Sequence, residues 1–281
     1  MLSLLKYFSY LILITTLALA CKTTAAAEQK TLRIAVATNF TPILKKLLPE
    51  FERQTGITIQ ILSASTGTLF LQIKHGAPFD IFLSADNRRP EALERDGLIL
   101  AKSRKTYALG QLALFSHGKF TQLNQLNDTN NSTSRFAIAN PETAPYGKAA
   151  KEVLQHLGLW TRYNQNLVTG INVSQTFNQI RSKAVSVGIV ANSQLTFNNL
   201  SGIIIPNEFH QPIKQQLVIL KRSKNILQAQ QLSDFILSET SQKSIIRYGY
   251  AQPSLSQPFS YQPLSLKAPK TPELPRVITT S

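Results

Sequence analysis

Three short segments of the chain place hydroxyl, amide or small residues directly after an apolar run and before a helical pattern. They are Ala37-Thr-Asn-Phe40, Ser63-Ala-Ser-Thr-Gly67 and Asn172-Val-Ser174. A strand that ends in such residues at a helix N-terminus leaves backbone N–H and hydroxyl groups pointing into one space, where the helix dipole favours negative charge. The chemistry that these residues can perform is the binding of an anion by neutral donors.

A fourth segment, Ala144-Pro-Tyr-Gly147, adds a phenol beside another predicted helix start, and none of the four segments carries a basic side chain. Taken singly, each residue has a simpler interpretation, because Thr and Asn are ordinary helix caps. Thr66 fits such a cap, and Tyr146 fits a packed aromatic residue. Their occurrence together favours the binding interpretation.

The elements that must position these segments alternate between strand and helix. Apolar runs of strand length are predicted at residues 32–37, 57–62, 79–83, 110–115, 135–139, 167–170, 185–190, 203–205 and 216–220. Helical spacing of apolar residues is predicted at residues 43–51, 69–75, 86–93, 149–157, 172–181, 226–237 and 241–248. Pro49 predicts a kink in the first of these helices or a new helix start. The alternation predicts an α/β fold with parallel sheets and crossover helices.

The order of the elements predicts two Rossmann-like lobes. Residues 30–107 and 214–250 form lobe I, residues 108–213 form lobe II, and the chain crosses between them near 106–110 and 206–216. In open α/β sheets, ligands bind outside the carboxyl ends of the strands. We therefore expect the ligand cleft to lie between the two lobes.

Both ends of the chain differ from this ordered part. Residues 1–20 combine Lys6, an apolar run and a small-residue site, which is typical of a secretory signal peptide, with an uncleaved anchor as the alternative. Cys21, the only cysteine, stands where a lipoprotein is lipidated, whereas Ala25-Ala-Ala27 offers a cleavage site as late as residue 27. Lipid-anchored and soluble secreted forms both stay open. The Pro-rich segment 252–281 is predicted to be a disordered tail.

Charge and motif content exclude several classes of function. The net charge is +15, but Lys and Arg are scattered and form no stripe interleaved with aromatic residues, so we expect no nucleic-acid partner. The four histidines are dispersed, and no nucleophile elbow, phosphate-binding lysine loop or metal-ligand spacing is present. We expect a monomeric protein that is not an enzyme, with no cofactor and no direct metal ligands.

Several strings along the chain resemble one known family. They are Ala37-Thr-Asn-Phe40, Gly76-Ala-Pro-Phe-Asp80 followed by Phe82-Leu-Ser-Ala-Asp86, Asn140-Pro-Glu with Ala144-Pro-Tyr-Gly147, and Leu154-Gln-His-Leu-Gly158. Their order and spacing, from about Thr31 to Gly249, are similar to those of the periplasmic molybdate-binding proteins of ABC importers. The resemblance implies a type II periplasmic binding protein that captures molybdate or tungstate outside the cytoplasm and delivers it to the importer's membrane subunits.

The resemblance also implies a set of ligand-binding residues. Thr38 and Asn39 match the family's first anion-binding loop, and Thr66 matches the second. Tyr146 matches a position that uses either its backbone amide or its hydroxyl, and Val173 matches a backbone N–H donor at a helix start. Many members have a ligand tyrosine after the strand Gly188-Ile-Val190, where this chain has alanine. The chain therefore resembles the subgroup in which Tyr146 supplies the tyrosine.

Neutral donors suit a fully deprotonated tetrahedral dianion, because such a ligand carries no proton that needs an acceptor. A phosphate site would need a carboxylate acceptor, and the nearest candidates are Asp80, which we expect to be structural, and Asp86, which we expect to cap a helix. Sulfate has the same charge and shape as molybdate. Binding of sulfate, phosphate or another oxyanion, and an enzyme of the same fold, stay open as alternatives.

Overall fold

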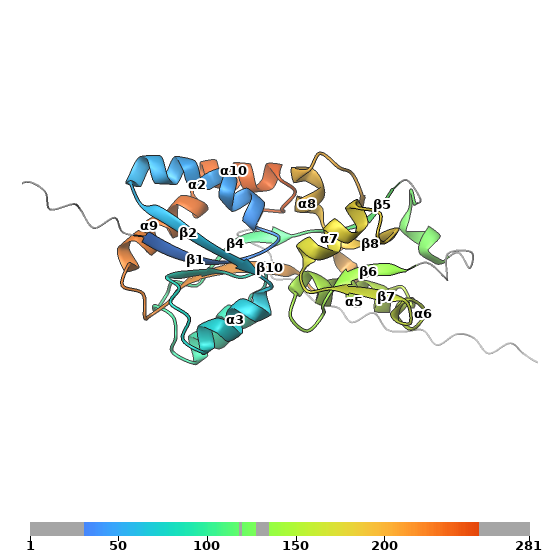
Figure 1. Cartoon of the computed structure of the whole chain (residues 1–281), viewed down its shortest axis with the longest axis horizontal. Coiled ribbons are helices and arrows are strands. Elements are labelled where there is room, and N and C mark those ends of the chain that lie inside the picture. Colours follow the sequence, from blue (N-terminus) through green and yellow to red (C-terminus); the bar gives the residue numbers. More distant parts are fainter. Residues whose placement is uncertain (1–30, 118–119, 128–134, 253–281) are drawn as a thin grey trace, which may run out of the picture.

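The structure is a computed structural model that describes residues 31–117, 120–127 and 135–252. Two lobes lie side by side, each built on a five-stranded sheet with helices on both faces (Figure 1). This arrangement confirms the predicted two-lobed α/β fold. The signal segment 1–20, Cys21 and the tail beyond residue 252 lie outside the described residues.

The sheet of lobe I has the strand order β2-β1-β3-β10-β4. Its strands are β1 (Thr31–Ala37), β2 (Thr58–Ala64), β3 (Ile81–Leu83), β4 (Lys105–Gly110) and β10 (Ile213–Ile219). Its helices are α2 (Thr41–Thr55), α3 (Thr66–Lys74), α4 (Arg88–Arg95), α9 (Ile226–Leu237) and α10 (Glu239–Arg247). Helices α2, α9 and α10 lie on one face of the sheet and α3 lies on the other (Figure 1).

The core of lobe I follows from the alternation of side chains along its central strand. In β1, Ile34 and Val36 pack in one cluster with the apolar faces of α2 and α9. Ala35, between them, packs in a second cluster with Leu69 of α3 and Leu93 of α4. The strand is therefore buried on both faces, as its continuous apolar run indicates.

The sheet of lobe II has the strand order β7-β6-β8-β5-β9. Its strands are β5 (Leu112–Ser116), β6 (Phe136–Ala139), β7 (Leu167–Gly170), β8 (Val187–Ala191) and β9 (Ile203–Ile204). Its helices are α5 (Pro145–His156), α6 (Trp160–Asn164), α7 (Val173–Arg181) and α8 (Asn192–Phe197), with short 3₁₀ turns at Leu123–Asn127 and Asn207–Phe209. Helices α5 and α6 lie on the face opposite α7 and α8 (Figure 1).

The sheets are mixed, which corrects the prediction of parallel sheets. Strands β1, β2 and β3 are parallel, but β10 runs antiparallel to β3 and β4. In lobe II, β6, β7 and β8 are parallel and β5 runs antiparallel to β8 and β9. The reason is the path of the chain: β5 and β10 enter their lobes from the cleft, whereas the parallel strands lead toward it.

The two crossings fall at Gln111 and at residues 205–212. Strand β4 pairs with β10 as far as Gly110, and β5 begins at Leu112. The strand predicted at 110–115 corresponds to β5, whereas β4 was not predicted from the sequence, and the boundary predicted after residue 107 falls inside β4. The return connection runs from β9 to β10.

The helices differ from the sequence prediction in two respects. Helix α2 is continuous through Pro49, so no new helix starts there, and it ends at Gly56 with a φ of 67°. Helices α6 and α8 were not predicted from the sequence. Within the described ranges, no helix combines the length and the apolar character that a membrane span requires.

Candidate functional site

A small pocket lies between the lobes at the carboxyl ends of the strands that lead to the cleft. Its cavity volume is about 10 Å³, so the two lobes lie close together around it. All five residues predicted as ligand-binding line it. The full lining is Ala37, Thr38, Asn39, Ser65, Thr66, Ala85, Ala144, Pro145, Tyr146, Asn172 and Val173.

A wider groove of about 760 Å³ opens between the N-terminal end of α2 and the length of α7. Thr38 and Asn172 line both the groove and the small pocket. The groove and the small pocket therefore lie next to each other.

Thr38 and Asn39 follow β1, but neither caps α2. The residue before the helix is Phe40, whose side chain has no polar group that could cap the helix. The side-chain amide of Asn39 instead donates to Gln215 Oε1 at 2.9 Å and to Tyr250 Oη at 3.2 Å. The side chain of Asn39 is therefore engaged with Gln215 and Tyr250.

Thr66 is the first residue of α3, and Ser65 is the cap: its Oγ accepts a hydrogen bond from the N–H of Thr68 at 3.3 Å. The Thr66 hydroxyl oxygen accepts a hydrogen bond from the N–H of Ala85 at 3.0 Å, which fixes the hydroxyl at the pocket wall. Thr66 is only 1% exposed. Because that oxygen already accepts from the protein, its proton is the part that a ligand can use.

Tyr146 lies in the first turn of α5, after Ala144 and Pro145, where no side chain caps the helix. Its phenol oxygen accepts a hydrogen bond from Gln215 Nε2 at 3.0 Å. No acceptor in the described part of the chain takes the phenol proton. Burial, with a smaller contribution from nearby Tyr250, raises the pKa of Tyr146 well above its usual value, so the phenol keeps that proton for donation.

Val173 begins α7, and Asn172 caps the helix by accepting a hydrogen bond from the N–H of Gln175 at 3.0 Å. Among the residues that the structure describes, no acceptor faces the backbone N–H of Val173. This is the arrangement of free donors that binds anions at helix N-termini. Ser174 adds a contact between the lobes, because its hydroxyl donates to the carbonyl oxygen of Thr38 at 3.3 Å.

Gln215 is a residue of this site that the sequence analysis missed. Its side chain is fully buried behind the pocket, where Oε1 accepts from Asn39 at 2.9 Å and from Tyr107 at 3.1 Å. Tyr250 completes the network by donating to the carbonyl oxygen of Asn39 at 2.9 Å. The only signal in the sequence is a polar residue just before the buried run of β10, which does not reveal its partners.

The electrostatics of the pocket come from backbone dipoles. The N-terminal ends of α3, α5 and α7 meet at the pocket, and Tyr146 is the only ionisable residue in its lining. The side-chain oxygens of Thr66 and Asn172 already accept hydrogen bonds from the protein. The pocket therefore offers donors and a positive potential, which suits a compact anion without protons.

Asp80 and Asp86, the two candidate carboxylate acceptors of a phosphate site, have structural roles, as predicted. Asp86 accepts a hydrogen bond from the backbone N–H of Arg89 at 3.1 Å, at the start of α4, and pairs with its guanidinium group. Asp80 precedes β3, at the opposite end of the sheet, and accepts from the N–H of Arg33 at 2.7 Å and the hydroxyl of Ser223 at 2.6 Å. Within the described ranges, no three His, Cys, Asp or Glu side chains gather as metal ligands would.

Two α/β lobes joined by two crossings, with helix N-termini around a pocket between them, define a two-lobed solute-binding protein. The chain belongs to the bacterial extracellular solute-binding protein family, and its match to this family covers residues 32–251.

Individual relatives agree with this assignment. The chain is 36% identical over 241 residues to the molybdate-binding protein ModA of Azotobacter vinelandii, covering 83% of this chain and 92% of the relative. It is 35% identical over 237 residues to ModA of Rhodobacter capsulatus, covering 84% and 94%. A solved structure of the Azotobacter vinelandii periplasmic molybdate-binding protein superposes with a TM-score of 0.74 at 34% identity, covering 79% of this chain and all of that one.

Proposed function

We propose that this protein captures molybdate, with tungstate as a second ligand, outside the cytoplasm and delivers it to the membrane subunits of an ABC importer. The observation that carries the proposal is the pocket itself, in which three helix N-termini and neutral donors meet between two lobes. Relatives named as molybdate-binding proteins at 35–36% identity support the choice of anion. The protein is a binding protein and not an enzyme.

Each lobe contributes donors to the bound anion. Lobe I offers the hydroxyl of Thr38, the backbone N–H of Asn39 and the hydroxyl and N–H of Thr66. Lobe II offers the first turn of α5 at Tyr146 and the backbone N–H of Val173. A tetrahedral dianion placed between them accepts from both lobes at once, and this is the physical reason for lobe closure around the ligand.

The same donor set disfavours phosphate, which keeps a proton near neutral pH and needs an acceptor for it. The side-chain oxygens of Thr66 and Asn172 are already occupied, and Asp86 is paired with Arg89. Sulfate has the charge and shape of molybdate, so it competes with molybdate for this site more strongly than phosphate does. Separation of the two depends on the fit of the shorter sulfate bonds within the same ring of donors.

Calorimetric titration of residues 28–281 with molybdate, tungstate, sulfate and phosphate tests the proposal. We expect tight binding of molybdate and tungstate and much weaker binding of sulfate. A preference for sulfate would overturn the choice of anion, and binding of none of the four would overturn the oxyanion function.

The description of the family as extracellular supports a location outside the cytoplasm. We propose that the signal segment 1–20 directs its export and that the exported protein acts as a monomer. Mass spectrometry of the mature N-terminus decides between cleavage before a lipidated Cys21 and cleavage as late as residue 27. The monomer proposal is checked by light scattering of the purified protein with and without molybdate.

A further inference from the structure

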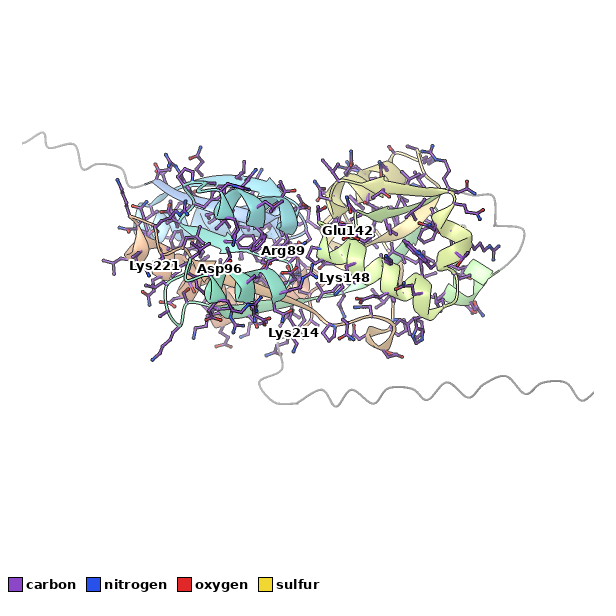
Figure 2. The ribbon with its side chains drawn as sticks, turned by 90° about the horizontal axis from the view of Figure 1, so that it is seen from below. Arg89, Asp96, Glu142, Lys148, Lys214 and Lys221 are labelled. Carbon is purple, nitrogen blue, oxygen red and sulfur yellow. The ribbon has the colours of Figure 1, made fainter. Side chains whose placement is uncertain are left out.

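We propose that Arg89 is a positioning residue for anion capture: it holds the closed form of the two lobes without touching the ligand. This inference rests on the proposed oxyanion binding and adds a residue outside the pocket lining to it. Arg89 belongs to α4 of lobe I, and Figure 2 shows it facing Glu142 of lobe II across the boundary between the lobes.

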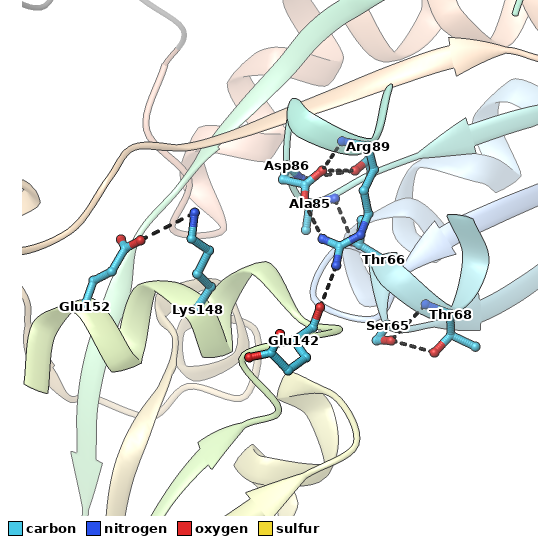
Figure 3. Close-up of polar contacts among 10 residues, drawn as sticks. Ser65, Thr66, Thr68, Ala85, Asp86, Arg89, Glu142, Lys148 and Glu152 are labelled. Atoms are coloured by element: carbon cyan, nitrogen blue, oxygen red, sulfur yellow. Dashed lines mark hydrogen bonds and ion pairs between the residues drawn. The ribbon is translucent and has the colours of Figure 1, made fainter. Parts of the chain in front are cut away.

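Two successive carbonyl groups of lobe II accept hydrogen bonds from lobe I. The guanidinium Nη2 of Arg89 donates to the carbonyl oxygen of Glu142 at 2.8 Å, as Figure 3 shows. The backbone N–H of Gly67, in the first turn of α3, donates to the carbonyl oxygen of Thr143 at 2.8 Å. One short loop of lobe II is therefore bound to two helices of lobe I.

The side chain of Arg89 is fixed before it crosses the cleft. Asp86 accepts from the backbone N–H of Arg89 with one carboxylate oxygen and pairs with its Nη1 through the other. The hydroxyl of Ser84 donates to the first of these oxygens at 3.1 Å. The paired side chains are only 10% and 15% exposed. Nη2 is thus aimed at lobe II at little further cost in side-chain entropy.

The loop that Arg89 holds positions part of the anion site. Asn140 stiffens this loop, since its Oδ1 accepts from the N–H of Glu142 at 2.9 Å and its carbonyl oxygen accepts from the N–H of Ala144 at 2.8 Å. Ala144 leads directly into the first turn of α5, which carries Tyr146. The contact of Arg89 with Glu142 therefore fixes the α5 donors relative to the α3 donors.

The contact favours the closed form because it joins two lobes, whereas the Asp86–Arg89 pair lies within one lobe and survives opening. A ligand that binds only the closed form has an apparent affinity scaled by the fraction of molecules that close. Loss of the Arg89 contact therefore weakens binding through faster release. A role in attracting the anion by charge would instead slow association, but Asp86 already offsets the charge of Arg89.

The test compares Arg89→Lys and Arg89→Gln with the same two changes at Arg88, the exposed neighbour on the same helix. Lysine keeps the charge but lacks the planar fork that serves Asp86 and Glu142 together. Molybdate affinity, association rate and dissociation rate are measured for all four variants, with the thermal unfolding of each ligand-free protein. For both Arg89 variants we expect an affinity loss of about tenfold to a hundredfold, carried by the dissociation rate.

The Arg88 variants should bind like the wild type. The melting temperature of the ligand-free protein should fall less for Arg89→Lys, which keeps a cation beside Asp86, than for Arg89→Gln, which leaves that carboxylate unpaired. If Arg89→Lys binds like the wild type, or if the affinity loss lies in the association rate, the positioning role is wrong. Failure of the wild type to bind any oxyanion would instead overturn the proposed function. Small-angle scattering of Arg89→Lys at saturating molybdate should still show closure.

Discussion

The phenol oxygen of Tyr146 and the side-chain nitrogen of Gln215 lie 3.0 Å apart, and their hydrogen bond joins α5 of lobe II to β10 of lobe I. The other crossing strand approaches the same phenol, since a Cβ placed on Gly110 would lie 2.5 Å from Tyr146 Oη. Both connections between the lobes therefore pack against a residue of the pocket wall. The two segments that join the lobes, at Gly110 and Gln215, therefore fix the position of the Tyr146 phenol in the pocket wall.

Tyr146→Phe should weaken molybdate binding by about 1.5–3 kcal/mol, the value of a hydrogen bond to a charged group. The change removes the phenol proton and leaves Gln215 Nε2 buried without its acceptor. Calorimetric titration of wild type and variant measures the difference. An unchanged affinity would show that the phenol contacts only the segments that join the lobes and does not bind the anion.

Tyr163→Phe is the matched control for this prediction. Tyr163 is equally buried in lobe II, and its hydroxyl donates to the carbonyl oxygen of Leu126 at 3.0 Å, away from the pocket. We expect this variant to lose stability without losing affinity for molybdate.

The local elements of this fold are predictable because their signals are local. The apolar spacing of α2 and the glycine that ends it, the cap at Asn172 and the buried run of β1 all involve neighbours in the sequence. The resemblance to one family over residues 31–249 then indicates the pocket residues. The five predicted residues indeed line one pocket.

The rest depends on contacts between distant parts of the chain. The side chain of Asn39 looked like a pocket donor, but its partners Gln215 and Tyr250 lie 176 and 211 residues away and draw it behind the wall. The antiparallel direction of β10 depends on where the chain re-enters lobe I, and no local sequence pattern predicts that point. The contact between Arg89 and Glu142 likewise exists only once two lobes are in place.

Gly67→Ala should weaken anion binding without destabilising the ligand-free protein. A Cβ at this position would lie 2.9 Å from both Arg89 Nη2 and the carbonyl oxygen of Thr143, so the lobes could not close fully. Alanine is a better helix former than glycine, by up to about 1 kcal/mol, so α3 itself should tolerate the change. We expect about a tenfold loss of affinity, comparable to one lost hydrogen bond.

Calorimetry and thermal unfolding of ligand-free Gly67→Ala measure the two effects separately. If the melting temperature falls while the affinity is kept, the close approach at Gly67 matters for folding and not for closure. Small-angle scattering with saturating molybdate should show a less compact complex than that of the wild type.

The free energy of unfolding should fall as the pH rises above about 10. Burial is the main cause that raises the pKa of Tyr107, Tyr146 and Tyr250 above the usual value. The unfolded chain loses these protons near pH 10 while the folded protein retains them, so each tyrosine lowers stability by about 1.4 kcal/mol per pH unit there. Urea unfolding between pH 8.5 and 11 measures the slope.

Tyr250→Phe provides the control for this pH dependence, because it removes one buried phenol and leaves the other two in place. Removal of one buried phenol should make the slope shallower by the share of one tyrosine. Phenolate absorbance of the folded wild type should also stay low at pH 10.5 for the buried phenols. A slope that Tyr250→Phe leaves unchanged would contradict the assignment to buried tyrosines.

Val173→Pro should test the backbone donor at the start of α7 with little effect on the fold. Val173 is the first residue of the helix, where proline is well tolerated because its missing N–H has no partner within the helix. The preceding Asn172 is extended, with φ −156° and ψ 171°, which is the conformation that a following proline requires. The change therefore removes one N–H from the pocket, and calorimetry should show molybdate affinity reduced about tenfold to a hundredfold. Val173→Ala keeps that N–H and should bind nearly like the wild type, so equal losses in the two variants would show that the side chain matters and the backbone donor does not.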